Sequence, residues 1–488
     1  MSKYNLFRNH SYIFQKEEYN VSRYLSYLLK SPIPINAEKV DKLRLTPKMY
    51  WIIVASLIEV ILSWSIIYML TNHNPLSLLW GISYVVFFPF YIILGLYTKK
   101  PIEVLNKQIV IKKCRKRILA LKKNGLKVIA ITGSYGKTTT KTFIKQLLEK
   151  KYKVYATPKS YNTLFGIAQP TFKLEVVKSV LDYLSNDVEY FIVEMGAYSL
   201  NDIKILTDAF PPDMSVLTGI SSVHLERFKT LDKIIKAKTE LIRKTPKGNK
   251  IFLNISNKYI KSIARKYEND YQILTYSDKD SNAKLYGRIT QATPHKTTIE
   301  INCSNRQDTL TTSIIGKGNI LNLCGAMLVA LECSVDIDNI SNSVSNMLNI
   351  ESRMQLIDDG TGILLINNGY SSNFMSFKQS IATLEMFENY YKVLVTPGIF
   401  EAGKKTYDLH YKLGKKITKS IDLVILLTGK NNIQQIEGLL EGMKSSNYPQ
   451  EKITKISKIE DFMFVVKRKN LVPCVVLFEN DLPDIYNT

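Results

Sequence analysis

The sequence predicts an α/β protein with two such domains, preceded by a pair of transmembrane helices. Three observations support this prediction: short apolar strands that alternate with helical stretches from residue 126 onward, a second set of this kind from about residue 350, and two long apolar runs before residue 98. Alternation of strands and helices is typical of a parallel sheet with crossover helices. A chain of 488 residues with 45% hydrophobic content can fill two or three cores.

The first hundred residues contain the two candidate spans. Residues 49–71 are apolar except for Glu59, and residues 76–97 carry no charge. Each run matches the roughly 20 residues that cross a bilayer, and a pair of buried core helices is the alternative. We expect a basic N-terminal segment (1–48), a transmembrane hairpin (49–98) with a kink at Pro89, and a basic linker helix (99–125).

Basic residues flank the hairpin on both sides. They are Lys39, Lys42, Arg44 and Lys48 before it, and Lys99, Lys100, Lys107, Lys112, Lys113, Arg115, Lys116, Arg117, Lys122 and Lys123 after it. The positive-inside rule places both ends in the cytoplasm, so we expect an inner (cytoplasmic) membrane protein with two spans and its catalytic domains in the cytoplasm. The linker helix is either bound to anionic lipids or solvated, and the residues leave both options open.

The net charge of +23 favours anionic partners such as nucleotides, phosphorylated substrates and lipid headgroups. No zinc-finger spacing, basic-region heptad or RNP-type aromatic motif accompanies this charge, so nucleic acid is not an expected partner. The five cysteines are scattered and form no CxxC pair, which argues against a disulfide framework or a structural zinc site.

A glycine loop joins the first strand of the α/β region to a helix. Its residues, expected to bind the nucleotide phosphates, are Gly133, Ser134, Tyr135, Gly136, Lys137, Thr138 and Thr139. Backbone amides of such a loop surround phosphate oxygens, the lysine reaches the terminal phosphates and the threonine hydroxyl can hold magnesium. The loop is shorter than the standard GxxxxGK[ST], because Ile131 stands where that pattern has its first glycine.

This GxxGKTT form resembles the ATP loop of the Mur ligase family, and later segments follow in that family's order. They are TPKSYNTLFGI (157–167), FIVEMGAYSLNDI (191–203), MSVLTGISSVHLERFKTLDKIIKAKTELI (214–242), LNISN (253–257), GKGNILN (316–322) and INNGYSSN (366–373). The resemblance covers residues 126–488. It implies a central P-loop ATPase domain (126–349) and a Rossmann-like C-terminal domain (350–488).

The resemblance also implies roles for single residues. The catalytic set is Lys137, Glu194, His224 and Lys238, and two magnesium ions are held by Thr138, Glu194, His224 and a carbamylated Lys238. Further nucleotide contacts are Asn254, Asn319, Arg353 and Asn368, and substrate contacts are Asn162, Thr163, Gly166 and Asn373.

The implied reaction is ATP-dependent amide-bond formation by an acid–amino-acid ligase. Transfer of the γ-phosphoryl group turns a carboxylate into an acyl phosphate, which an amine then attacks. Lys137 and the magnesium ions would stabilise the developing charge. Within the family, the chain looks most like the type that adds D-alanyl-D-alanine to a UDP-muramoyl tripeptide, with Glu401 and His410 at positions typical of that type. The expected partners are therefore ATP, a cell-wall precursor and an amino acid or dipeptide.

The chain departs from the family pattern at three positions. Thr163 replaces an asparagine, Gly318 replaces a histidine, and Asn368 replaces an aspartate that usually binds the ATP ribose. The first hundred residues also lack the soluble UDP-sugar-binding domain, so we expect the precursor at the membrane, including lipid-linked forms. Two alternatives remain: a membrane-associated ligase for another wall or capsule polymer, and a membrane-tethered nucleotide-binding scaffold that has lost catalysis.

Overall fold

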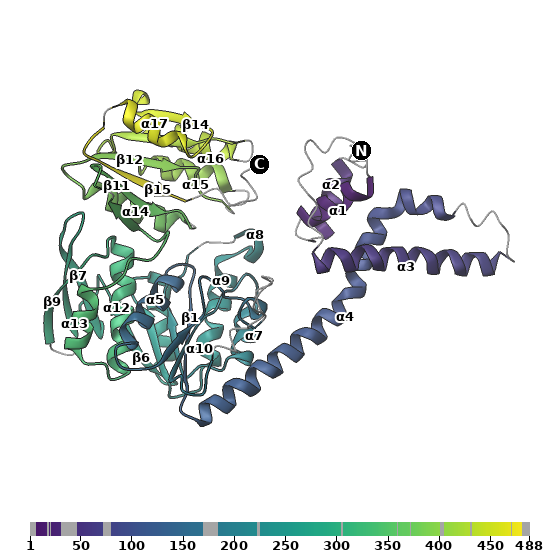
Figure 1. The fold of residues 1–488 in the computed structure, drawn as a ribbon, viewed down its shortest axis with the longest axis horizontal. Coiled ribbons are helices and arrows are strands. Elements are labelled where there is room, and N and C mark those ends of the chain that lie inside the picture. Colours follow the sequence, from purple (N-terminus) through teal and green to yellow (C-terminus); the bar gives the residue numbers. More distant parts are fainter. Residues whose placement is uncertain are drawn as a thin grey trace. The chain divides into compact units, whose positions relative to one another are not determined.

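The computed structural model contains two compact units, Met1–Val110 and Ile111–Asn487. It describes residues 6–16, 19, 21–30, 46–71, 80–168, 184–221, 225–303, 306–358, 360–370, 372–400, 405–429, 432–469 and 471–480. Figure 1 shows the helices of the first unit and the two sheets of the second.

The first unit contains α1 (Leu6–Lys16), α2 (Val21–Lys30), α3 (Pro47–Leu70) and the beginning of α4 (Trp80–Lys123). Its core consists of Ile13, Phe14, Tyr24, Ile52, Phe88, Ile92 and Leu96. Residues of all four helices therefore contribute. The N-terminal segment, expected only as a basic stretch, thus contains two helices that pack on the apolar helices.

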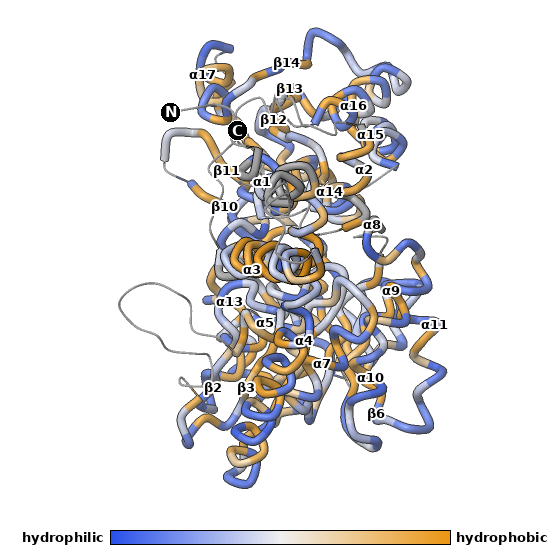
Figure 2. Tube along the Cα trace, turned by 90° about the vertical axis from the view of Figure 1, so that its right-hand side faces the viewer, coloured by the Kyte–Doolittle hydropathy of each residue, from blue (hydrophilic) through white to orange (hydrophobic). Residues whose placement is uncertain are grey.

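Helix α3 is the apolar helix that the sequence predicts as the first span. Thr46 caps its N-terminus by accepting a hydrogen bond from the Met49 amide at 3.2 Å. Among the described residues, Lys48–Leu70 is the one stretch long and apolar enough to cross a bilayer, and 11% of its most apolar window is buried. Figure 2 shows this helix as mostly hydrophobic. Its exposed apolar side chains include Leu57, Ile58, Ile61, Leu62, Ile66 and Met69.

The second expected span lies in α4, but residues 76–79 fall outside the described ranges, so a two-helix hairpin stays a prediction. The sequence placed a boundary at residue 98, whereas α4 is one helix of 44 residues that continues through the basic stretch. The change from apolar to basic residues determines whether the helix prefers lipid or water, but it does not end the helix. Lysine, arginine, leucine and isoleucine are all compatible with helical structure. Figure 1 shows that α4 bends in its first half, where Pro89 lies.

The last turns of α4 are fixed to the central domain. Cys114, Ile118 and Leu121 are buried. Arg117 donates to the Leu184 carbonyl at 2.8 Å, and Lys122 pairs with Asp213 at 2.8 Å. The expected linker is therefore anchored at its C-terminal end and is not solvated along its whole length.

The central domain is a nine-stranded sheet in the order β2-β3-β1-β4-β5-β6-β7-β8-β9. The strands are β1 (Lys127–Thr132), β2 (Val154–Ala156), β3 (Tyr190–Glu194), β4 (Met214–Leu217), β5 (Lys250–Asn254), β6 (Gln272–Ser277), β7 (Leu285–Ala292), β8 (Thr297–Cys303) and β9 (Arg306–Thr312). Pairing is parallel from β2 to β7 and antiparallel from β7 to β9. The short apolar runs KVIAIT, KVYAT, YFIVEM, MSVLTG and IFLN predict β1 to β5, whereas no predicted strand corresponds to β6 to β9.

Helices accompany this sheet as crossover and covering elements. They are α5 (Lys137–Leu148), α6 (Leu164–Ala168), α7 (Asp202–Ala209), α8 (Leu225–Phe228), α9 (Leu231–Lys238), α10 (Glu240–Lys244), α11 (Lys258–Tyr267), α12 (Lys317–Glu332) and α13 (Ile337–Ser345). A large hydrophobic cluster joins α5 and α12 to the strands, with Phe143, Leu147, Phe252 and Met327 fully buried. Helix α5 is therefore held firmly behind the glycine loop that precedes it.

The C-terminal domain is a six-stranded sheet in the order β10-β11-β15-β12-β13-β14. Its strands are β10 (Gln355–Asp358), β11 (Ile363–Asn368), β12 (Tyr391–Thr396), β13 (Leu423–Leu427), β14 (Ile453–Ile456) and β15 (Cys474–Glu479), and its helices are α14 (Phe374–Glu385), α15 (Thr406–Gly414), α16 (Ile433–Ser445) and α17 (Asp461–Arg468). All pairs except β10–β11 are parallel. The expectation of a second, Rossmann-like domain is confirmed at the level of an open α/β sheet with two buried faces.

Candidate active site

The glycine loop connects β1 to α5, and its backbone geometry requires glycine at Gly136. That residue has φ +79°, and a Cβ atom there would lie 2.5 Å from Oδ1 of Asn322. The Ser134 amide donates to the Gly219 carbonyl at 2.7 Å, which fixes the start of the loop beside the end of β4. Lys137 begins α5, and its Nζ donates to the Gly133 carbonyl at 3.0 Å. The loop therefore presents a helix N-terminus and a lysine to one space, which suits a polyphosphate.

Glu194 is the centre of the polar network beside the loop. It ends β3, which pairs with β1, and it is 1% exposed. Its Oε2 accepts from Oγ1 of Thr138 at 2.9 Å and from Nζ of Lys141 at 3.2 Å, while its Oε1 accepts from Nδ2 of Asn162 at 3.2 Å. Burial alone would raise the pKa of Glu194, but the charges of Lys137 and Lys141, with these hydrogen bonds, lower it below its usual range. The carboxylate is therefore ionised.

Arg353 brings a further cation to the loop from the segment between the two domains. Its Nη2 donates to Oγ1 of Thr138 at 3.5 Å, and its guanidinium lies 4.0 Å from the centroid of the Tyr370 ring. Asn319 donates to the Arg353 carbonyl at 3.1 Å. Two expected nucleotide-binding residues, Asn319 and Arg353, are thus in contact with each other, and Arg353 contacts the phosphate loop.

Lys238 lies at the end of α9 and is 3% exposed. Its Nζ donates to the Ala197 carbonyl at 3.3 Å. Burial, and then the nearby charge of Lys137, lower its pKa to about 7. Lys238 lines the same pocket as the phosphate loop, together with Gly133, Ser134, Lys137, Asn162, Gly196, Ala197 and Tyr198. The structure therefore unites Lys137, Glu194 and Lys238, three of the four expected catalytic residues, in one region.

The fourth, His224, lies outside the described residues, as does Glu401. The metal-binding role of His224 stays a prediction. Within the described set, the hydroxyl of Thr138 and the carboxylate of Glu194 offer adjacent oxygen ligands, which are the ligands that Mg²⁺ prefers. These residues fit a magnesium ion next to the phosphate loop.

The other expected nucleotide residues make structural hydrogen bonds. Asn254 donates to the Thr218 carbonyl at 2.7 Å and so supports the end of β4. Asn368 uses both amide hydrogens within the C-terminal domain, donating to Glu479 at 2.8 Å and to Ser380 at 3.0 Å. Asn368 is 8% exposed, so its side chain is committed to the interior in this structure, and contact with a ribose stays a prediction.

Of the expected substrate residues, Asn162 reaches the pocket. Its carbonyl accepts from the Gly196 amide at 2.8 Å, and its side chain binds Glu194. Oγ1 of Thr163 accepts from the Gly166 amide at 3.2 Å at the start of α6. Asn373 is the N-cap of α14 in a capping box. Thr163, Gly166 and Asn373 therefore have clear local structural roles, and their contact with substrate stays a prediction.

Two residues near the site were missed by the sequence reasoning. Lys141 reaches Glu194, and Thr157 accepts from the Glu194 amide through Oγ1 at 3.2 Å. Helical spacing offered a signal for Lys141, because it lies four residues after Lys137 and so on the same face of α5. No comparable pattern marks Thr157, whose contact depends on how the loop after β2 folds back.

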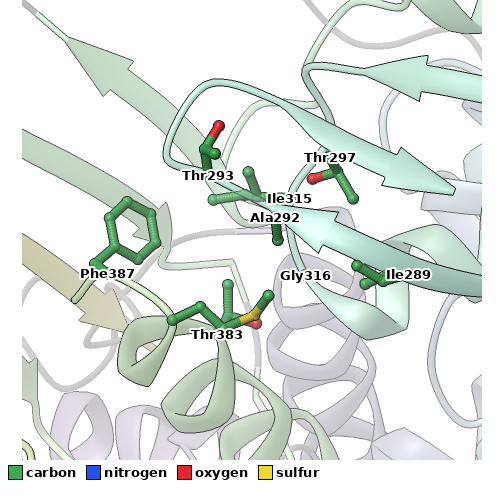
Figure 3. Close-up of a pocket in the computed structure, with 9 residues that line it drawn as sticks. Ile289, Ala292, Thr293, Thr297, Ile315, Gly316, Thr383 and Phe387 are labelled. Carbon is green, nitrogen blue, oxygen red and sulfur yellow. The ribbon is translucent and has the colours of Figure 1, made fainter.

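A second pocket lies where the β7–β8 hairpin and the start of α12 meet the end of α14. It is lined by Ile289, Ala292, Thr293, Thr297, Ile315, Gly316, Thr383, Met386 and Phe387. Figure 3 shows Phe387, Ile315 and Thr383 around this space. No lining residue is ionisable, so this pocket offers no acid or base of its own.

Comparison with known proteins relates this site to one family. Residues 131–330 match the family described as the Mur ligase middle domain. The "UDP-N-acetylmuramoyl-tripeptide--D-alanyl-D-alanine ligase" of Bacillus subtilis is 24% identical over 368 residues, which is 74% of this chain and 74% of that protein. The ligase of that name from Buchnera aphidicola subsp. Acyrthosiphon pisum is 25% identical over 307 residues, 61% of this chain and 63% of the relative. The chain thus spans less than two thirds of the second relative.

Solved structures share the fold. The MurF ligase of Thermotoga maritima in complex with ADP has a TM-score of 0.66 at 21% identity, covering 77% of this chain and 80% of that one. MurF of Acinetobacter baumannii has a TM-score of 0.66 at 20% identity, covering 77% of each chain. At these identities the likeness establishes the fold alone.

Proposed function

We propose that this chain, which carries a Mur ligase middle domain, is an ATP-dependent acid–amino-acid ligase of the MurF type that adds D-alanyl-D-alanine to a muramoyl tripeptide in peptidoglycan precursor synthesis. The names of the relatives support the substrate class. One observation carries the proposal: Glu194 binds Thr138 of the phosphate loop and Asn162 of the loop after β2, so a phosphate site and a substrate loop meet at one carboxylate.

This arrangement suits phosphoryl transfer to a carboxylate. The Lys137 ammonium, held at the Gly133 carbonyl of the loop, would stabilise the charge that the terminal phosphate of ATP gains, and Arg353 would add a second cation on the Thr138 side. Glu194 and Thr138 would hold a magnesium ion, which neutralises phosphate charge and orients the γ-phosphate. Asn162 would place the precursor carboxylate against that phosphate. The carboxylate would attack the γ-phosphorus, and ADP would leave to give the acyl phosphate. The amine of the dipeptide would then attack the acyl carbon, lose a proton and release inorganic phosphate.

Lys238 is proposed to carry a carbamate that helps to hold a second magnesium ion. A carbamate forms when a neutral amine adds CO₂ and loses a proton, and a pKa of about 7 keeps much of the Lys238 amine neutral at physiological pH. The resulting anion would offset the positive charge of Lys137, Lys141 and Arg353. An unmodified lysine would repel the metal.

The chain is proposed to act at the cytoplasmic face of the inner membrane on a precursor held there, including a lipid-linked form. Support comes from the exposed apolar surface of α3 and from the continuity of α4 with the central domain. Tethering raises the effective concentration of a membrane-bound partner to the millimolar range. Lysines on α4 would add about 1 kcal/mol per close contact with anionic lipids.

The assay for the central activity uses the full chain in lipid with ATP, Mg²⁺, UDP-N-acetylmuramoyl tripeptide and D-alanyl-D-alanine. Phosphate release that requires both organic substrates, together with a product of the mass of the pentapeptide, is the expected result. Release without dependence on the dipeptide would point to a different acceptor. No nucleotide turnover with any muropeptide would favour the scaffold alternative.

A truncated chain that begins at residue 99 tests the role of the membrane. For a lipid-linked precursor in vesicles, kcat/KM should fall by about a hundredfold relative to the full chain, because tethering no longer raises the local concentration. For the soluble UDP-linked precursor, the two proteins should be similar. Equal activity of both proteins on both precursors would remove the proposal of membrane presentation.

A further inference from the structure

We propose that Lys141 is a positioning residue that holds Glu194 and the precursor loop, residues 157–163, in one arrangement, and that its charge limits how tightly Glu194 binds Mg²⁺. This inference rests on the proposed function, in which Glu194 is a magnesium ligand and the loop receives the precursor. It gives a role to the buried Lys141, whose position phosphate binding alone does not explain.

Lys141 lies on the same face of α5 as Lys137, one turn further from the phosphate loop. Its side chain is 4% exposed. Nζ contacts Oε2 of Glu194 at 3.2 Å and also donates to the Lys159 carbonyl. A single ammonium group therefore joins the carboxylate at the end of β3 to the backbone of the loop that follows β2.

The contact with Lys141 falls in the middle of the precursor loop, at Lys159. Lys159 has φ +45°, a conformation that a residue with a Cβ atom adopts only when its surroundings enforce it. Backbone hydrogen bonds hold both ends of this loop, from the Thr157 amide to the Ile192 carbonyl at 3.0 Å and from the Gly196 amide to the Asn162 carbonyl at 2.8 Å. Between them, Lys141 and Asn162 link the loop to the Glu194 carboxylate, so a movement of that side chain would be transmitted to the loop through these two contacts.

The hydrogen bonds of Lys141 hold the loop, but its positive charge weakens the binding of Mg²⁺. Its ammonium contacts Oε2, the same carboxylate oxygen that accepts from Thr138, the other residue that would hold magnesium. A buried cation at this distance from the carboxylate repels a second cation strongly, because little water screens it. Replacing the ammonium with an uncharged group of similar length should therefore tighten Mg²⁺ binding while it loosens the loop.

Tighter Mg²⁺ binding together with weaker precursor binding distinguishes the proposal from general damage to the site, which would weaken the binding of both. The test compares Lys141→Met with Lys145→Met, one turn further along α5, where the side chain is 42% exposed and pairs with Glu149. Mg²⁺ is titrated in the presence of a fluorescent ADP analogue, so that no turnover occurs. Mg²⁺ binding is followed by the change in the fluorescence of that nucleotide. KM for UDP-N-acetylmuramoyl tripeptide is then measured at saturating Mg²⁺ and ATP.

For Lys141→Met, we expect the half-saturating Mg²⁺ concentration to fall about threefold or more, and the precursor KM to rise about tenfold or more, as for loss of a buried charged hydrogen bond. Lys145→Met should match the wild type in both. Weaker Mg²⁺ binding in Lys141→Met, or an unchanged precursor KM, would overturn the proposal.

Two further measurements keep the outcome decisive. If Lys141→Met does not fold, Lys141→Arg replaces it, because arginine keeps the charge but differs in shape. This variant should show wild-type Mg²⁺ dependence with a raised precursor KM. A changed Mg²⁺ dependence would contradict the account. Hydrogen exchange of residues 157–163 without any precursor should be faster in Lys141→Met than in Lys145→Met. A wild-type chain that binds Mg²⁺ and ADP but does not use the muramoyl peptide would refute the proposed function, while the Mg²⁺ titration would still decide the role of Lys141.

Discussion

Lys137→Ala is expected to lower the rate of substrate-dependent phosphate release by about a hundredfold or more, as for other single groups that stabilise transition-state charge. The ammonium lies at the first residue of α5, within reach of the Gly133 carbonyl and beside Glu194. Charge on the transferred phosphoryl group grows only during the reaction, so the loss should appear in kcat more than in the KM for ATP. Single-turnover phosphate release measures this directly.

The matched control for this substitution is Lys145→Ala, which removes an exposed lysine from the same helix. It should retain wild-type kcat, and both variants should keep the wild-type melting temperature within a few degrees, because Lys137 contributes one hydrogen bond to the loop. Turnover of Lys137→Ala close to that of the wild type would remove the phosphate site from the account.

Lys238→Ala is expected to be inactive and to regain part of its activity with acetate or formate. The substitution removes both the amine and any carbamate formed on it, leaving a space beside Ala197 in the pocket that contains Lys137. A small carboxylate can enter that space and supply the missing negative charge next to magnesium. Activity is measured against carboxylate concentration, with chloride at equal ionic strength as the salt control.

Lys233→Ala, on the exposed face of α9, is the positional control and should behave as the wild type with and without acetate. Mass spectrometry of the native protein under CO₂ should show an added mass on the peptide that contains Lys238. An unmodified amine under those conditions, together with no rescue by any small carboxylate, would refute the carbamate proposal.

The sequence predicted the parts of the fold in which local pattern and tertiary environment agree. Buried parallel strands occur as short apolar runs, so KVIAIT, YFIVEM and DLVILLT predict β1, β3 and β13 at nearly their observed bounds. The strands β7 to β9 were missed because polar residues occupy their exposed faces and blur the apolar runs, as in the QATPHKTT stretch around the β7–β8 turn. The helices α1 and α2 were missed because their apolar residues are interrupted by polar ones and their core partners lie in distant helices.

The site was predictable where chemistry dictates the residue type. The glycine loop, Lys137 and Glu194 are the residue types that phosphate and metal binding require, and they occur in the order that the Mur ligase family has. The structure brings them together. Thr157 was not predictable, because its contact with Glu194 forms only when the loop after β2 folds back. For Lys141, helical spacing could indicate the shared face with Lys137, but its contact with the Lys159 carbonyl depends on the same loop. Asn368 shows the reverse case: the resemblance to the family implies a ribose contact, whereas the side chain binds Glu479, a partner 111 residues away.

The most direct test of the central claim is the transfer of oxygen from the precursor to phosphate. A muramoyl tripeptide labelled with ¹⁸O in the reacting carboxylate is incubated with the full chain, ATP, Mg²⁺ and D-alanyl-D-alanine, and the released phosphate is analysed by mass spectrometry. Activation as an acyl phosphate predicts one ¹⁸O atom in each phosphate released and the other in the new amide. Phosphate released without label while ATP is consumed would contradict this account.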